Sequence, residues 1–448
     1  MAPQASHPVE ERIIQLLRHL GIEQAQFAAC MSGDWAGLVT LHPDMVSSLT
    51  LVCPWGMKVS TLCPHTSRLL VITGGQGQPA EEVHRAVASL PGTTLIDLRD
   101  YFSPLWADVI ADRAEEVGAA MMEFLSSMEQ RQRLKEVALP EGEGEIAGIS
   151  YSIRGSGPPL VLFPLGLAPS QWQPLLPLLS ARYCTITVGG PALGMVAFLE
   201  ARGRGYLRVV RSLVDETRLR PEETVLEVGC GSGVILRWLA RHTNGANHIT
   251  GVDINPYLLR EAAALARKEG LGGVIELREG NAEALPFADS HFDVTMACTV
   301  MEEGNADRML AECVRVTKTG GRVAVIVRSL DMPGWVNLPL GAELKKKTEA
   351  QRGHVLKEGC ADASLYRRMR QAGLQQLTML PQWATFSEGE RLQFQQERIV
   401  AMLEPEEVNE WREAIAWADA ERTFFIAQPF HSAVGTKAGR SRATATPS

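Results

Sequence analysis

Three glycines lie within residues 227–233, EVGCGSG, directly after an apolar run at 224–226 and before the helix-like segment VILRWLARH. A strand, a glycine-rich turn and a helix in this order present backbone N–H groups at a helix N-terminus, where an anionic group is favoured. Gly229, Gly231 and Gly233 have no side chains that would block a ligand close to the backbone. The pattern predicts a binding loop, although a turn without any ligand would show the same glycines.

Polar residues follow at the ends of the next two apolar runs. HITGVDI reaches Asp253 about 20 residues after the last glycine, where a carboxylate can accept hydrogen bonds from both hydroxyls of a ribose. The alternative role for Asp253 is a surface helix cap. In the later segment GNAEALPF, Asn281 is suited to an adenine amino group and the Ala282 N–H to a ring nitrogen. Leu285 or Phe287 would pack on the base.

Taken together, these residues resemble the class I S-adenosylmethionine-dependent methyltransferases, especially the small-molecule group that includes ubiquinone and menaquinone methyltransferases. The resemblance covers about residues 205–437, through VLEVGCGSG, GVDINP, GNAEALPFADSHFDV and AECVRVTKTGGRVAVI. It implies a Rossmann-like sheet of seven strands with the last antiparallel, S-adenosyl-L-methionine as the cofactor, and methyl transfer to a small molecule. A dinucleotide-binding dehydrogenase would more often show G-x-G-x-x-G, whereas the spacing here is G-x-G-x-G.

The resemblance also assigns cofactor contacts to positions of this chain. The amino-acid end of the cofactor is expected at the glycine loop, the ribose at Asp253, and the adenine at the loop after the third strand, where many members have Asp in place of Asn281. The residue that ends the fourth strand is expected beside the reactive methyl. The expected cofactor-binding residues are Glu227, Gly229, Gly231, Gly233, Asp253, Ile254, Asn281, Ala282 and Cys298.

The acceptor side is less sharply defined. Methyl transfer from a sulfonium is an in-line displacement that needs alignment and exclusion of water, and it needs a base only for an acceptor such as a hydroxyl. Glu302 and His431 are candidate bases, and the alternatives are a helix-start carboxylate for Glu302 and a structural histidine for His431. A long segment after residue 328 is expected to form a lid. The expected substrate-binding residues are Tyr206, Met301, Trp335 and His354, of which Met301, like Cys298, is also typical of a core.

The second half of the chain alternates strand-like and helix-like segments. We expect strands at 224–228, 248–253, 274–279, 292–297 and 322–328, with two more near 376–380 and 423–429. Asn255 fits a helix N-cap and Pro256 the first helical position. Strand and helix in alternation predict an α/β fold with a parallel sheet covered on both faces.

The front of the chain resembles an α/β-hydrolase whose segments are out of order. GIEQAQFAACMSGDWAGLVTLHPDMVSSLTLVCP is similar to the region around a hydrolase nucleophile, whereas residues 149–190 are similar to the beginning of such a domain. Either one domain is circularly permuted, or remnants of two copies are present. Permutation is the more economical reading, because a strand edge without its neighbours would be exposed.

The hydrolase triad looks lost. Aligned with G-x-S-x-G, the chain has Ala29 and Gly33 at the glycine positions and Met31 at the nucleophile, and a thioether cannot form an acyl intermediate. Ser32 or Cys30 would need a shifted turn to serve instead. VITGG is followed by QGQ in place of an acid, and LIDLRDYFSPLW has no histidine nearby. We therefore expect a degenerate domain that acts as scaffold, dimerisation surface or substrate-access module.

The composition of the chain narrows the class of protein to which it can belong. The 448 residues are 45% hydrophobic and 21% charged, which is typical of a globular protein with more than one domain. A net charge of -8 disfavours nucleic acid and anionic membranes as partners. The eight cysteines show no C-x-x-C pair, so a metal site is not expected, and without a visible signal peptide or apolar span we expect a cytoplasmic enzyme.

The expected organisation is a hydrolase-like domain at 1–197, a methyltransferase domain at 198–437 and a flexible tail at 438–448. Two alternatives to a methyltransferase stay open: a cofactor-binding regulatory protein without turnover, and a hydrolase that uses Ser32 or Cys30.

Overall fold

The computed structural model describes residues 8–439, apart from 104–106, 133, 352, 354 and 401. Two compact units divide the chain, Met1–Phe198 and Leu199–Ser448, and the division falls inside helix α7 (Gly194–Gly205). The expected tail lies outside the described residues from position 440 onward. None of the described helices is long and apolar enough to cross a membrane. The described residues also contain no cluster of His, Cys, Asp and Glu side chains suited to a metal ion.

The first unit is built on a sheet with the strand order β4-β3-β2-β1-β7-β8-β6-β5 among the described residues. Neighbouring strands are parallel except at β5–β6 and β6–β8. The strands are β1 (Ala25–Met31), β2 (Val46–Trp55), β3 (Leu69–Gln76), β4 (Thr94–Phe102), β5 (Gly142–Ile146), β6 (Ile149–Arg154), β7 (Pro159–Leu162) and β8 (Cys184–Gly189).

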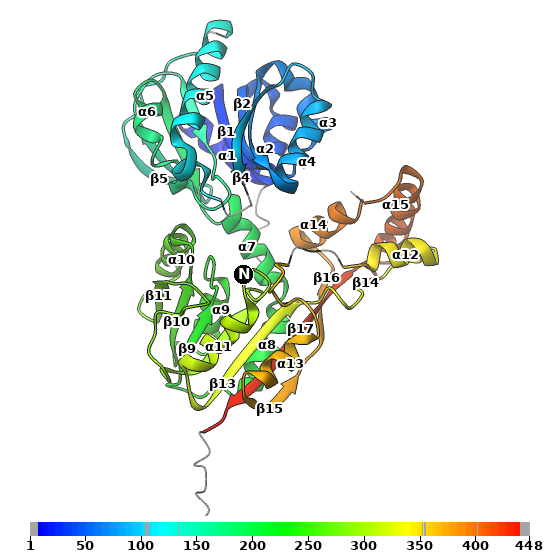
Figure 1. Cartoon of the computed structure of the whole chain (residues 1–448). Coiled ribbons are helices and arrows are strands. Elements are labelled where there is room, and N and C mark those ends of the chain that lie inside the picture. Colours follow the sequence, from blue (N-terminus) through cyan, green and yellow to red (C-terminus); the bar gives the residue numbers. More distant parts are fainter. Residues whose placement is uncertain are drawn as a thin grey trace, which may run out of the picture. The chain divides into compact units, whose positions relative to one another are not determined.

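Helices cover both faces of this first sheet (Figure 1). The central strands β1, β2 and β3 are apolar and buried along most of their length, as parallel strands covered on both faces require. The edge strand β5 carries Glu143 and Glu145 and is largely exposed, which discourages pairing with another chain. The helices are α1 (Val9–His19), α2 (Ser32–Leu41), α3 (Val59–Leu62), α4 (Gly77–Ala88), α5 (Val109–Arg131) and α6 (Leu176–Ser180).

The second unit has the strand path β11-β10-β9-β12-β13-β17-β14, with β15 and β16 also paired to β17. Strands from β11 to β13 are parallel, and β17 is antiparallel to each of its partners. The strands are β9 (Thr224–Val228), β10 (His248–Asp253), β11 (Ile275–Glu279), β12 (Phe292–Cys298), β13 (Thr317–Arg328), β14 (Trp335–Val336), β15 (Leu374–Met379), β16 (Gln382–Phe386) and β17 (Ile426–Lys437).

The expectation of seven strands in this sheet is wrong, because nine described strands take part. The cause is the length of β17, which has 12 residues and two long edges. Phe430 pairs with Arg328 of β13 on one edge and with Gln382 of β16 on the other. Ala427, nearer the start of β17, pairs with β14 and again with β16. The two additional strands, β14 and β16, therefore flank the first half of β17.

Helices cover both faces of the second sheet as well (Figure 1). One face buries Val210 and Leu213 of α8 against the sheet, and the other buries Leu310 of α11 and Met369 of α13. The helices are α8 (Leu207–Thr217), α9 (Val234–His242), α10 (Pro256–Lys268), α11 (Ala306–Val316), α12 (Ala342–Glu349), α13 (Ser364–Gln371), α14 (Gly389–Val400) and α15 (Pro405–Ala420). Near the β14–β16 end of β17, Figure 1 shows α12, α14 and α15 gathered together.

Local sequence chemistry starts the helices that follow the strand ends. The predicted cap at Asn255 is confirmed, since its side-chain oxygen accepts hydrogen bonds from the N–H groups of Tyr257 at 3.0 Å and Leu258 at 3.1 Å. Asn305 caps α11 in the same way through the N–H of Arg308 at 3.0 Å. Such caps satisfy the unpaired N–H groups of a first turn, and they fix where α10 and α11 begin after β10 and β12.

Candidate functional site

The glycine loop joins β9 to α9 at the carboxyl end of the sheet. Gly229, Gly231 and Gly233 have φ angles of 71°, 53° and 75°, which side chains rarely tolerate. A Cβ atom at Gly229 would also lie 2.5 Å from Cγ2 of Val300. The glycines are therefore required by the loop's own conformation and packing, and the loop keeps its N–H groups near the ends of the neighbouring strands.

Asp253 ends β10 and contacts the same loop. Its Oδ2 atom accepts a hydrogen bond from the N–H of Gly231 at 2.7 Å, and its Oδ1 atom accepts one from Asn255 at 2.9 Å. Burial raises the pKa of Asp253, while these N–H groups act to lower it. Each carboxylate oxygen keeps a second lone pair for a hydroxyl. The neighbouring Ile254 is 66% exposed, so an apolar surface lies next to the carboxylate.

Glu227 is the buried acid at the end of β9. Only 3% of the residue is exposed, and its Oε2 atom has no hydrogen-bond partner among the described residues. Burial raises the pKa of Glu227 well above its usual range, and the charge of Asp253 raises it further. A cationic group at this position would relieve both effects. Glu227 is therefore compatible with the predicted position of the cationic amino-acid end of the cofactor.

The loop after β11 lies beside Asp253, because the N–H of Gly280 donates to the Asp253 carbonyl at 2.9 Å. Asn281 is exposed, and its side-chain oxygen accepts a hydrogen bond from the N–H of Glu283 at 2.8 Å. One lone pair of the Asn281 oxygen is therefore already used by a hydrogen bond within the turn. Ala282 is partly buried, and Leu285 is 5% exposed. The positions of Asn281 and Ala282 are compatible with adenine binding beside Asp253, and the assignment of both residues to the adenine stays a prediction.

A buried ion pair supports the glycine loop from behind. Glu200 of α7 accepts hydrogen bonds from the Ser232 hydroxyl at 2.8 Å and from Nη2 of Arg237 at 2.6 Å. Arg237 also donates to the carbonyl of Ser232 at 2.7 Å and to Glu269 at 2.9 Å. The sequence interpretation missed this network. The available signal was an arginine within the apolar segment VILRWLARH.

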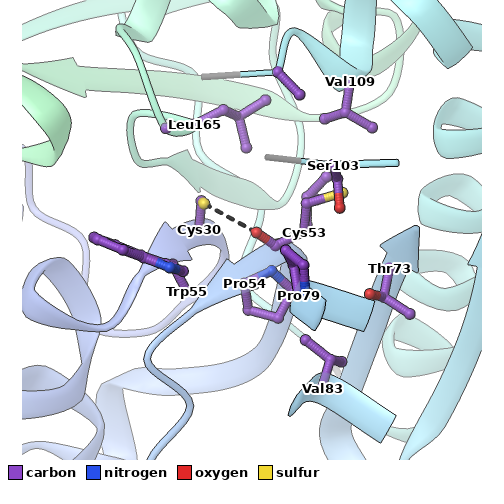
Figure 2. A pocket seen from close by; sticks show the side chains of 13 residues that line it. Cys30, Cys53, Pro54, Trp55, Thr73, Pro79, Val83, Ser103, Val109 and Leu165 are labelled. Carbon is purple, nitrogen blue, oxygen red and sulfur yellow. Dashed lines mark hydrogen bonds between the residues drawn. The ribbon is translucent and has the colours of Figure 1, made fainter. Parts of the chain in front are cut away.

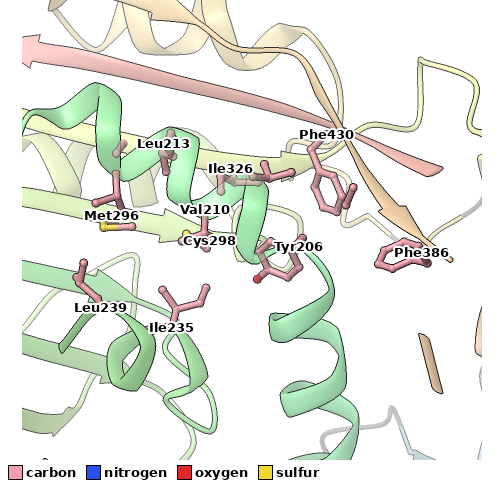
Figure 3. Packing of buried hydrophobic residues seen from close by; sticks show 14 of the residues in the cluster. Tyr206, Val210, Leu213, Ile235, Leu239, Met296, Cys298, Ile326, Phe386 and Phe430 are labelled. Carbon is pink, nitrogen blue, oxygen red and sulfur yellow. The ribbon is translucent and has the colours of Figure 1, made fainter. Parts of the chain in front are cut away.

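Tyr206 and Cys298 lie in the core between α8 and the sheet (Figure 3). The Tyr206 hydroxyl is 3.3 Å from the hydroxyl of Thr299, and its ring stacks on Phe430 with centroids 5.4 Å apart. Burial raises the pKa values of both Tyr206 and Cys298. The structure therefore brings a neutral phenol and a neutral thiol close to Glu227, whose charge contributes to both shifts.

Glu302 has a geometry that favours a structural role. The residue is fully buried, and its Oε1 atom accepts hydrogen bonds from the backbone N–H of Arg328 at 2.8 Å and from its Nε at 3.2 Å. A base must reach the proton that it removes. Oε1 of Glu302 thus holds the end of β13, while its Oε2 atom has no hydrogen-bond partner among the described residues.

His431 is also joined to neighbours at both ring nitrogens. Nε2 lies 2.8 Å from Oδ1 of Asp331, and Nδ1 lies 2.8 Å from the Tyr366 hydroxyl of α13. Burial acts to raise the pKa of Asp331, but hydrogen bonds from Ala363, His431 and Ser329 hold it at about 2. Side chains alternate along β17, so His431 faces α13 whereas Phe430 faces Tyr206. The structure does not bring His431 and Tyr206 together.

The remaining candidates for acceptor binding differ in their exposure to solvent. Met301 is 1% exposed and packs among core residues that include Leu310. Trp335 is 54% exposed and contacts Phe425 edge-on, with ring centroids 5.6 Å apart. Met301 is thus a core residue in this fold, while Trp335 stays available to a ligand. His354 lies outside the described residues.

The first unit contains a small pocket of about 40 Å³ at the ends of β1, β2 and β3 (Figure 2). The Cys30 thiol donates to the carbonyl of Cys53 at 3.2 Å, and burial is the main cause of its raised pKa. Met31 has φ -82° and ψ 130°, an ordinary extended conformation and not the strained turn of a hydrolase nucleophile. Among the described residues, no hydrogen bond joins Ser32 to a histidine.

Comparisons with known proteins match the second unit. The family described as "Methyltransferase domain" matches residues 225–321. The ubiquinone/menaquinone biosynthesis C-methyltransferase of Shewanella pealeana is 32% identical over 117 residues, which are 26% of this chain and 47% of the relative. The enzyme of that name from Sinorhizobium fredii is 39% identical over 116 residues, which are 25% of this chain and 45% of the relative.

Matched segments span about half the length of these curated relatives. Among solved structures, the YcgJ protein of Bacillus subtilis aligns with a TM-score of 0.36 and 16% identity, over 52% of this chain and 99% of that one. The family match contains the glycine loop, Asp253 and Asn281. The chain therefore carries a class I methyltransferase domain whose cofactor is S-adenosyl-L-methionine, as the resemblance predicted.

Proposed function

We propose that this protein is an enzyme that transfers the methyl group of S-adenosyl-L-methionine to a small-molecule acceptor. The observation that carries the proposal is Glu227, a buried carboxyl with an unpartnered oxygen among the described residues. It lies near Asp253 at the carboxyl ends of β9 and β10, which pair as parallel neighbours. Ligands of open α/β sheets bind at this edge.

The cofactor, when bound, supplies an electrophilic methyl group on a sulfonium. An electron pair of the acceptor, a π pair where the acceptor is carbon, would form the new bond as the carbon–sulfur bond breaks, the bonding electrons would stay on sulfur, and any proton that the methylated product must lose would leave after the transfer. The protein aligns the partners: Glu227 holds the cationic end, and Asp253 holds the ribose. Tyr206 packs against Phe430 at the acceptor side and excludes water.

The acceptor atom is proposed from two observations. Both ring nitrogens of His431 are engaged with neighbours, and Glu302 is fully buried and joined to Arg328 through Oε1, which favours acceptors that need no dedicated base. The curated relatives are named C-methyltransferases, so a carbon that is already ionised as an enolate is the first acceptor to test. Thiols and amines are the next classes, and a hydroxyl is the least favoured.

For the first unit, we infer a non-catalytic role as scaffold, dimerisation surface or substrate-access module. Strands β1–β4 form one block of its sheet and β5–β8 the other, and the blocks meet at the β1–β7 pair. Two contiguous blocks of this kind are what a circular permutation of one hydrolase-like sheet would leave. The ordinary backbone at Met31 and the neutral thiol of Cys30 support the loss of hydrolase activity.

The test is incubation with methyl-labelled S-adenosylmethionine and a metabolite extract, followed by identification of whatever gains the label. Glu227→Gln should reduce labelling at least about tenfold, because the amide cannot pair with a cation. The matched control Glu413→Gln, an exposed change on α15, should label like the unaltered protein. Tight cofactor binding without transfer from any extract would overturn the enzyme proposal in favour of a cofactor-sensing protein.

A further inference from the structure

Four arginines from three separate segments of the second unit lie close together. Arg202 is on α7, Arg328 ends β13, and Arg391 and Arg398 are on α14. Burial, followed by the charges of the other three, lowers the pKa of Arg391 to about 9. These four residues are called the arginine cluster below. Like charges this close repel one another, so the arrangement costs free energy in the absence of an anion.

Part of the cluster is held by protein groups. Arg391 donates to Oε1 of Gln428 at 2.9 Å, and its guanidinium lies 5.6 Å from the centre of the Phe386 ring. Arg328 pairs with Glu302 at 3.2 Å and with Glu303 at 3.3 Å. Arg202 differs, because its Nη2 atom is buried without a hydrogen-bond partner among the described residues. Unpaired buried donors of this kind are rare in folded proteins, and an anionic ligand would supply the missing acceptor.

A small cavity of about 40 Å³, enough for a compact anionic group, adjoins the cluster and is lined by Arg398, Gln395, Gln428 and Trp335. Gln395 is 5% exposed, and its Nε2 atom also lacks a partner among the described residues. Gln428, which accepts from Arg391, lines the same cavity. The cavity wall therefore offers N–H donors from an arginine and an amide, next to the indole of the predicted substrate residue Trp335.

Tyr206 connects this region to the expected cofactor end. Both Arg202 and Glu227 are close enough to influence its pKa, which burial raises. Phe386 and Phe430, which contact Arg391 and Tyr206 respectively, belong to the same core cluster (Figure 3). The arginine cluster thus lies on the Tyr206 side of the sheet, away from His431.

We propose that the arginine cluster and the adjoining cavity bind an anionic group of the methyl acceptor, either a carboxylate or a phosphate. Guanidinium groups pair with both through two parallel N–H donors. The inference rests on the proposed function, since it assigns the charge of the acceptor in the same site. A bound anion would accept hydrogen bonds from the unpaired N–H groups of Arg202 and Gln395, and it would offset the repulsion among the four arginines.

The test is calorimetric titration of the full chain, saturated with S-adenosylhomocysteine, with inorganic pyrophosphate and separately with citrate at low salt. We expect at least one anion to bind, and Arg391→Gln and Arg202→Met each to weaken that binding tenfold or more. Arg391→Lys, which keeps the charge, should recover part of the loss. Arg412→Gln, an exposed change on α15, is the matched control and should leave binding unchanged.

Binding of pyrophosphate alone would identify a phosphate-bearing acceptor, and binding of citrate alone would identify a carboxylate. The proposal is overturned if neither anion binds, or if binding survives both Arg391→Gln and Arg202→Met. Arg202→Met should melt no lower than the unaltered protein, so a lost anion site is separable from misfolding. Titration with S-adenosylhomocysteine alone tests cofactor binding without the arginine cluster, and the labelling experiment tests methyl transfer, so failure of the proposed function is distinguishable from loss of the anion site.

Discussion

The carboxylate of Asp253, on β10, accepts a hydrogen bond from the backbone N–H of Gly231 at 2.7 Å, in the loop after β9. One side chain thus holds the glycine loop and faces the expected ribose. Asp253→Ala should weaken S-adenosylhomocysteine binding at least about tenfold, because a charge-assisted hydrogen bond contributes about 1.5–3 kcal/mol. Isothermal titration measures the change, with the exposed Asp215→Ala on α8 as control. Unchanged affinity in Asp253→Ala would count against the ribose assignment.

The buried pair of Glu200 and Arg237 supports the same loop from the opposite side. Arg237→Ala should destabilise the second unit by about 3–5 kcal/mol, since it leaves Glu200 buried without its partner. Urea unfolding measures the loss in the transition that S-adenosylhomocysteine shifts to higher denaturant. The double variant Glu200→Gln with Arg237→Met should recover most of the stability. If both variants are equally unstable, the pair is not the source of the effect.

Asp34 in the first unit makes stability depend on pH. Its two carboxylate oxygens accept hydrogen bonds from the N–H of Gly194 at 2.9 and 3.1 Å, and burial raises its pKa to about 7. The folded form then holds the proton more tightly than the unfolded form, so stability falls as pH rises from about 4 to 7, by at most about 4 kcal/mol. Asp34→Asn should flatten this dependence in unfolding measurements across that range, whereas exposed Asp44→Asn should not. An unaltered slope in Asp34→Asn would refute the assignment.

Thiol chemistry tests the inference that the first unit has no hydrolase nucleophile. Cys63 is the exposed cysteine, while Cys30 is buried and its pKa is raised. Iodoacetamide should therefore modify Cys63 first and reach Cys30 only after unfolding, as followed by peptide mass spectrometry. A fluorophosphonate probe should leave Ser32 unlabelled. Rapid labelling of either Cys30 or Ser32 in the folded protein would restore the hydrolase alternative.

Much of the second sheet could be predicted, because its strands carry local signals. Strands β9 and β10 have the predicted bounds, since each is an apolar run that ends at a turn or an acidic residue. The strand near 423–429 was placed too early, and β17 extends to Lys437 because its partners lie far away in the sequence. Pairing of this kind leaves little trace in local composition.

The candidate site also contains residues that local sequence signals predict and residues that they do not. The glycine loop and Asp253 are readable because close backbone approach and a strand-end acid are local requirements. The arginine cluster was not predicted, because its members are separated by more than 60 residues except within α14, and only the folded chain brings them together. His431 was a candidate base because sequence alone does not tell which face of β17 it occupies. The cofactor-contact assignments themselves stay predictions.

Strand pairing in the first unit has a consequence for biosynthesis. Gln26 of β1 pairs with Leu160 of β7, which the ribosome adds 134 residues later. At roughly 5–20 residues per second, one edge of an apolar central strand waits on the order of ten seconds for its neighbour. An unpaired edge of this kind is open to other chains. The newly made protein therefore passes through an interval in which the unpaired edge of β1 can pair with another chain before β7 is available.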